Sequence, residues 1–240
     1  MITRTLAVIQ HTSADYLGLM EDHLEGRRIR FRYFRPFTSG GKLPGAADLE
    51  GGLVLLGGGP WGSAGGRDVP TLDAEVELTR AALAANVPLL GIGLGAQLLC
   101  LAAGGGSTPA PLTFDVGEAR RVRDDALNGY LPERYPLVRY MRDRPVLPSQ
   151  AVTLAVGDGG EPCLFSVGPR ALGFTGHPGM KTAMAEDLVM EFAEGPPEPA
   201  ASLVQLREAM PAIEDSLVPI MTGAVQLLGL MGPDPVPPAG

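Results

Sequence analysis

The sequence predicts an α/β protein with a mostly parallel central sheet that helices cover on both faces. Short, almost uncharged apolar runs alternate with segments of helical periodicity, as expected when crossover helices join buried parallel strands. Glycine clusters follow two of these runs, at 57–59 and 91–95. A chain of 240 residues can also bury a large core without help from disulfides or metals.

The first half of the chain supplies the alternation. Strands are predicted at residues 4–11, 28–36 and 51–60, the second of them near a sheet edge because its apolar and polar residues alternate. Helices are predicted at 14–26 and 71–87. Residues 87–105, VPLLGIGLGAQLLCLAAGG, then indicate a buried strand, a glycine-lined turn and a further helix.

The second half has a different pattern. Short strands at 151–157, 162–168 and 170–177, separated by Gly, Asp and Pro, predict hairpins appended to the sheet. We therefore expect one domain over 1–193, a Pro-rich connector over 194–201, a helical segment over 202–231 that packs on the domain, and a flexible tail over 232–240. Pro219 is expected to kink the helical segment.

Composition excludes several classes of function. The net charge of −8 argues against a nucleic-acid partner. The two cysteines form no metal-binding pair, so neither a metal nor a cofactor is expected. The N-terminus lacks the pattern of a signal peptide, and the turn signals within 87–103 favour a buried unit over a membrane span. We expect a cytoplasmic protein with no membrane contact. Two arginine clusters, at 27–35 and 120–123, are either solvated faces or a basic rim for an anion.

The turn inside 87–105 has the form of a nucleophile elbow, which presents a reactive side chain between a strand and a helix. The residue at its apex is Gly93, which has no side chain. We expect Gly93 to adopt a backbone conformation that other residues reach only with strain.

Four segments resemble class I glutamine amidotransferases, in particular the stand-alone, GMP-synthase-like members. GIGLGAQLL resembles the G-[IV]-C-x-G-x-Q elbow, and LVLLGGGP resembles the strand and Gly-Gly loop that precede it. ALGFTGHPGMK resembles the late G-x-Q-F-H-P-E segment, and LAVIQH with DYLGLMEDHL resembles the first strand and helix. The resemblance covers residues 4–192 and implies a three-layer, flavodoxin-like fold.

In that family a cysteine thiolate attacks the amide carbonyl of glutamine, and a histidine oriented by a carboxylate moves the proton. The resemblance places His177 at the histidine position. Gly93 stands where the nucleophile is expected, and Gly179 stands where the carboxylate is expected. Two of the three side chains of the triad are thus absent, and a glutaminase is not expected.

The binding groups of the family are less affected, because most of them belong to the backbone. The resemblance implies that the N–H of Leu94 and that of Gly57, Gly58 or Gly59 can form an oxyanion hole. It also places Gln97 where the family holds its substrate.

Other nucleophiles are poorly placed. Cys100 lies nearly two helical turns beyond Gly93, about 10 Å along the helix. Cys163 belongs to a predicted strand far downstream, and Thr175 and Ser63 have no evident activating base.

Several functions therefore stay open. The chain could be a non-catalytic subunit that works through a synthetase or another protein, with its apolar C-terminal helix as the contact surface. It could bind glutamine or another small carboxylate in the old pocket. It could be an active transferase or hydrolase with relocated catalytic groups, or an amidotransferase whose role has decayed. Association with a second copy of the chain also stays open.

Overall fold

The computed structural model describes residues 5–231, and the tail expected at 232–240 lies outside them. The strands are β1 Thr5–Ile9, β2 Arg30–Phe34, β3 Leu53–Leu55, β4 Leu89–Ile92, β5 Gly106–Thr108, β6 Thr113–Arg121, β7 Arg134–Met141, β8 Arg144–Val146, β9 Ala151–Val156, β10 Pro162–Val167 and β11 Ala171–Phe174. The helices are α1 Met20–Gly26, α2 Leu72–Ala84, α3 Leu94–Ala102, α4 Thr182–Glu191 and α5 Pro199–Leu228, with short 3₁₀ turns η1 Ala46–Leu49 and η2 Ala126–Gly129.

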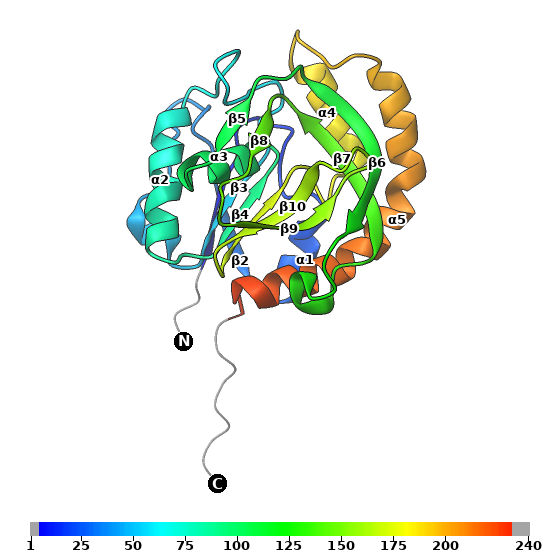
Figure 1. The fold of residues 1–240 in the computed structure, drawn as a ribbon. Helices are drawn as coiled ribbons and strands as arrows, with labels where there is room; N and C mark the ends of the chain where they lie inside the picture. Colours follow the sequence, from blue (N-terminus) through cyan, green and yellow to red (C-terminus); the bar gives the residue numbers. More distant parts are fainter. Residues whose placement is uncertain (1–4, 232–240) are drawn as a thin grey trace.

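Nine strands form one mixed sheet in the order β2-β1-β3-β4-β11-β10-β9-β6-β7 (Figure 1). The first five strands of this order are parallel, and β2 is at the edge, as the sequence predicts. Their carboxyl ends meet at one edge of the sheet, which is where α/β proteins place their sites. The loops after β1, β3, β4 and β11 are therefore neighbours.

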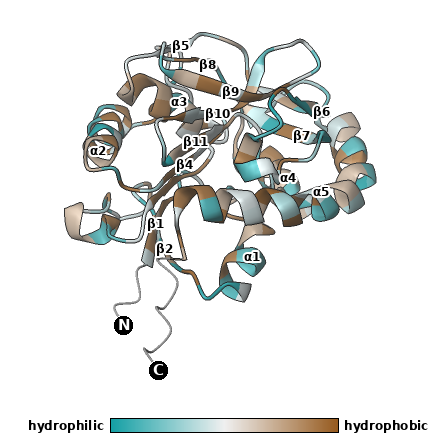
Figure 2. Cartoon of the chain, turned by 60° about the horizontal axis from the view of Figure 1, so that its bottom comes forward, coloured by the Kyte–Doolittle hydropathy of each residue, from teal (hydrophilic) through white to brown (hydrophobic). Residues whose placement is uncertain are grey.

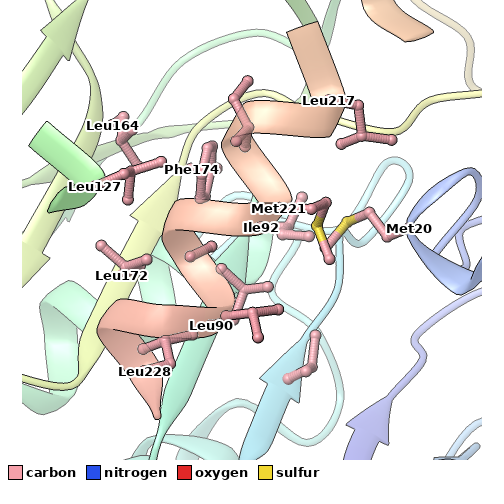
Figure 3. Packing of buried hydrophobic residues seen from close by; sticks show 14 of the residues in the cluster. Met20, Leu90, Ile92, Leu127, Leu164, Leu172, Phe174, Leu217, Met221 and Leu228 are labelled. Carbon is pink, nitrogen blue, oxygen red and sulfur yellow. The ribbon is translucent and has the colours of Figure 1, made fainter. Parts of the chain in front are cut away.

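Helices cover both faces of the parallel half. α2 and α3 lie on one face, and α1 with the C-terminal part of α5 lies on the other (Figures 1 and 2). On the α5 face, Leu217, Met221 and Leu228 pack against Leu90 and Phe174 of the sheet (Figure 3). This three-layer arrangement confirms the predicted α/β class.

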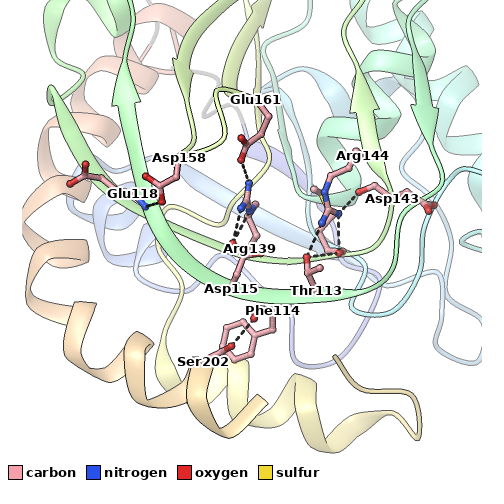
Figure 4. A network of polar contacts seen from close by, with 11 residues as sticks. Thr113, Phe114, Asp115, Glu118, Arg139, Asp143, Arg144, Asp158, Glu161 and Ser202 are labelled. Carbon is pink, nitrogen blue, oxygen red and sulfur yellow. Dashed lines mark hydrogen bonds and ion pairs between the residues drawn. The ribbon is translucent and has the colours of Figure 1, made fainter. Parts of the chain in front are cut away.

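The antiparallel half departs from the prediction. β9, β10 and β11 lie where strands are expected, but β11 also pairs in parallel with β4 and so belongs to the centre of the sheet. The long strands β6 and β7 were not predicted. Their charged side chains obscure the alternation of a half-buried strand. Arg139 of β7 pairs with Asp115 of β6 and with Glu161 in the turn before β10, in a polar network that forms only on folding (Figure 4). α4 and α5 cover apolar side chains of the same two strands.

Two helices differ from their predicted form. The helix expected at 14–26 begins only at Met20, and the preceding residues form turns. Gly18 has a φ of 62°, and a Cβ there would lie 2.2 Å from the carbonyl oxygen of Gly179, so the turn packs too tightly for a side chain. α5 contains Pro211 and Pro219 and changes direction along its length (Figure 1). No helix within residues 5–231 is long and apolar enough to span a bilayer.

Candidate functional site

Gly93 forms the apex of a sharp turn between β4 and α3. Its backbone has φ 56° and ψ −112°, a combination that side chains disfavour, and its N–H donates to the carbonyl oxygen of Phe174 at 2.8 Å. A Cβ at this position would meet one atom within 4 Å, the Cα of Gly57 at 3.4 Å. Space is therefore available above Gly93, and it is the backbone conformation that favours glycine.

We expect Gly93→Cys to lower the free energy of unfolding by about 1–3 kcal/mol, because cysteine must adopt this strained conformation. Chemical denaturation of both proteins measures the difference. Gly26→Cys is the matched control, since Gly26 has no atom within 4 Å of its Cβ position and no positive φ. If Gly93→Cys costs no more than the control, this explanation of the glycine is wrong.

His177 follows β11 and is almost fully buried. Its Nε2 lies 2.8 Å from the carbonyl oxygen of Tyr16 and must donate to it, while Nδ1 accepts the N–H of Gly179 at 3.1 Å. Burial lowers the pKa of His177 to about 4, so the imidazole is neutral at physiological pH. Because backbone groups occupy both ring nitrogens, no lone pair is left to deprotonate a nucleophile.

Gly179 is covered by the turn that precedes α1. The N–H of Leu19 donates to its carbonyl oxygen at 2.9 Å. A Cβ on Gly179 would lie 2.9 Å from Cγ and 3.0 Å from the backbone nitrogen of Met20. A side chain at this position would therefore require the turn before α1 to move.

The proposed oxyanion donors lie together at the same edge of the sheet. Gly57, Gly58 and Gly59 follow β3, and Leu94 is the first residue of α3, whose N-terminus favours negative charge. The Cβ position of Gly58 is 2.6 Å from a methyl group of Leu94, so the loop packs on the helix start. Within residues 5–231, the backbone N–H groups of these four residues have no hydrogen-bond acceptor in the protein.

Gln97 is fully buried and its side-chain amide is engaged within the protein. Its oxygen accepts the hydroxyl proton of Ser63 at 2.5 Å, and its nitrogen donates to the carbonyl oxygen of Arg142 at 2.6 Å. Asp143 accepts the backbone N–H of Ser63 at 2.8 Å. Through these hydrogen bonds, Gln97 and Ser63 connect α3 to the loop that follows β3 and to the turn between β7 and β8.

The two cysteines and Thr175 are buried. Burial raises the pKa of the Cys100 thiol to about 12 and that of Cys163 to about 11, so both stay protonated. The hydroxyl of Thr175 is buried and has no partner among the described residues. It directly follows Phe174, whose carbonyl oxygen holds Gly93.

A buried ion pair that sequence reasoning missed supports the glycine loop. His11, at the end of β1, donates from Nδ1 to the carbonyl oxygen of Gly57 at 2.9 Å and from Nε2 to Glu75 of α2 at 2.8 Å. Both side chains are fully buried. Burial lowers the pKa of His11, but the charge and hydrogen bond of Glu75 outweigh it, and the pKa of His11 is raised. The sequence signal for this ion pair is Glu75, an acidic residue among the buried positions of α2.

A second missed residue, Asp15, lies in the loop after β1. Its side chain is almost fully buried, and one oxygen would lie 2.0 Å from a Cβ on Gly57, so the carboxyl group rests against that glycine. The other oxygen, Oδ1, has no hydrogen-bond partner among residues 5–231. Burial raises the pKa of Asp15 to about 7, with His11 lowering it and Glu191 raising it further. The neighbouring Tyr16 supplies the carbonyl oxygen that binds His177.

Comparisons with known proteins place this arrangement in a family. The chain resembles a glutamine amidotransferase from Methylobacillus flagellatus, with 21% identity, 99% of each chain covered and a TM-score of 0.80. It also resembles one from Thermotoga maritima, with 21% identity, 97% of this chain and 100% of that chain covered and a TM-score of 0.72. A putative GMP synthase subunit from Thermoplasma acidophilum has 17% identity, covers 88% of this chain and 99% of its own, and has a TM-score of 0.57. At these identities the likeness establishes the fold.

No curated protein matches the chain. The family model described as "Glutamine amidotransferase class-I" matches residues 36–157, which is more than half of the chain. The chain therefore belongs to the class I glutamine amidotransferase family.

Proposed function

We propose that this protein binds glutamine or a related small molecule at the elbow without hydrolysing it. The observation that carries the proposal is the division of the site into two parts. The reacting part has no nucleophile at Gly93 and no free nitrogen on His177. The binding part keeps its backbone N–H groups without protein acceptors among residues 5–231.

The chemistry of the family explains why this division matters. Amide hydrolysis through a covalent intermediate needs a thiolate and a base within hydrogen-bond reach of it. Loss of one member of such a unit lowers the rate by orders of magnitude, and the residual rate comes from binding and the oxyanion hole. Binding to backbone donors does not need either of the missing side chains.

The test measures reaction and binding on the same protein. We expect no release of ammonia from glutamine above the buffer rate, both for the native chain and for Gly93→Cys. Calorimetry on the native chain is expected to detect binding of glutamine and no binding of leucine, which is of similar size and lacks the amide. Ammonia release by the native chain would contradict the proposal and favour relocated catalytic groups. Release by Gly93→Cys alone would contradict the inference from His177.

A role as a subunit is the second candidate function. One fold neighbour is described as a putative GMP synthase subunit, and α5 exposes Val204 and Val218 on its outer side while α4 exposes Met190. A synthetase chain that covers these residues would bury apolar surface that now faces solvent. A stable complex with such a chain that Val218→Glu abolishes would support this role.

A further inference from the structure

Asp15 lies beside the space above Gly93, and Gly57 separates the two. Oδ2 of Asp15 lies 2.0 Å and Oδ1 lies 3.4 Å from the position of a Cβ on Gly57, and the Cβ position of Gly93 lies 3.4 Å from the Cα of Gly57. A small ligand above Gly93 would therefore contact Gly57, the residue against which Asp15 packs. A side chain at Gly57 would collide with the carboxylate, so glycine at this position lets Asp15 pack directly against the loop.

Among the described residues, none of the charged groups around Asp15 binds its buried Oδ1. His11 is the nearby cation, but Gly57 and Glu75 already occupy its two ring nitrogens. Glu191 of α4 accepts the N–H of Ala14 at 3.2 Å, and its charge opposes ionisation of Asp15. Tyr140 of β7 also faces this region, since burial first and then nearby acids including Asp15 raise its pKa to about 12. No side chain within residues 5–231 donates a hydrogen bond to Oδ1.

We propose that Asp15 is a specificity-determining residue of this site and accepts an N–H of a primary carboxamide whose carbonyl oxygen is held by backbone N–H groups at the start of α3. The proposal rests on the proposed function. A carboxamide offers an acceptor and a donor on one group, which matches unpaired N–H donors beside an unpaired carboxylate oxygen. A carboxylate ligand offers no N–H, and an ionised Asp15 repels it.

This role of Asp15 makes ligand choice depend on pH. With a pKa of about 7, Asp15 is mainly protonated at pH 5.5 and mainly ionised at pH 8.0. Glutamine binding should therefore strengthen as pH rises through this range, because the ionised carboxylate is the better acceptor. Glutamate binding should weaken over the same range, because like charges then meet.

Calorimetry with glutamine and glutamate at pH 5.5 and 8.0 tests the proposal on three proteins. For the native chain we expect the Kd for glutamine to fall roughly tenfold from the lower to the higher pH. Asp15→Asn keeps the shape of the side chain and removes its titration, so its affinities should not change with pH. Asp22→Asn, at an exposed position of α1, is the matched control and should behave as the native chain does.

Each outcome supports or contradicts the role of Asp15. Glutamine binding with the same pH profile in the native chain and in Asp15→Asn would overturn the role of Asp15 and leave the proposed function standing. Absence of glutamine binding to the native chain at both pH values would overturn both. If Asp15→Asn does not fold, the ¹³C carboxyl resonance of Asp15 in the native chain gives the answer. Saturating glutamine should lower the pKa that this resonance reports, and an unchanged pKa would overturn the proposal.

Discussion

Replacing Glu75 by alanine is expected to lower the free energy of unfolding by about 3–5 kcal/mol, the usual cost of removing one partner from a buried ion pair. Glu75 is fully buried and holds His11, which in turn holds the carbonyl oxygen of Gly57. The substitution leaves a buried imidazole N–H without an acceptor and opens a cavity beside Thr71, whose hydroxyl also donates to Glu75. Chemical denaturation measures the effect.

Glu77→Ala on the same helix is the matched control. Its carboxylate pairs with Arg80, but both side chains are largely exposed, and such pairs contribute about 0.2–1 kcal/mol. Equal losses in the two variants would mean that the His11–Glu75 pair does not stabilise the fold. We also expect Glu75→Ala to weaken glutamine binding, because Glu75 orients His11, the residue that holds the carbonyl oxygen of Gly57.

The pH dependence of stability gives an independent check on the same pair. The pKa of His11 is raised in the folded state, so the pair contributes fully below the unfolded value of 6.5 and its contribution is lost as pH rises through the folded value. The difference in stability between the native chain and Glu75→Ala should accordingly shrink toward high pH. A difference that grows with pH would contradict the ion-pair interpretation.

Gly179→Glu, the change that would supply the missing carboxylate, is expected to lower the free energy of unfolding by about 3–5 kcal/mol. The new Cβ would lie 2.9 Å from Cγ and 3.0 Å from the backbone nitrogen of Met20, so the turn before α1 would have to move, and the charged group would enter a buried region. For the same reason the double variant Gly93→Cys/Gly179→Glu is not expected to release ammonia from glutamine. Denaturation and an ammonia assay on the same preparations measure both effects.

Gly195→Glu controls for the introduction of the charge. Gly195 is exposed, and no atom lies within 4 Å of its Cβ position, so this variant should unfold like the native chain. Ammonia release by the double variant would mean that the turn before α1 can move away from Gly179 and let His177 take up a catalytic position.

The order of strands and helices around the elbow was predictable because each depends on local pattern. The apolar runs before the glycine clusters become β3 and β4, and the amphipathic segment between them becomes α2. β6 and β7 were not predictable in this way. Their polar residues, such as Asp115 and Arg139, find partners only across strands and so do not produce the apolar alternation of a half-buried strand.

The family resemblance, the elbow turn and the absence of a side chain at its apex could be read from the sequence, because they depend on residue types at close spacing. The neutral form of His177 and the lack of room at Gly179 depend on the folded chain. The turn before α1 binds His177 through Tyr16 and also covers Gly179, and Tyr16 is 161 residues away from His177 in the sequence. Tertiary structure also decided the roles of His11, Glu75 and Asp15. The first two meet across 64 residues, and the properties of all three come from burial and from neighbours that only folding brings together.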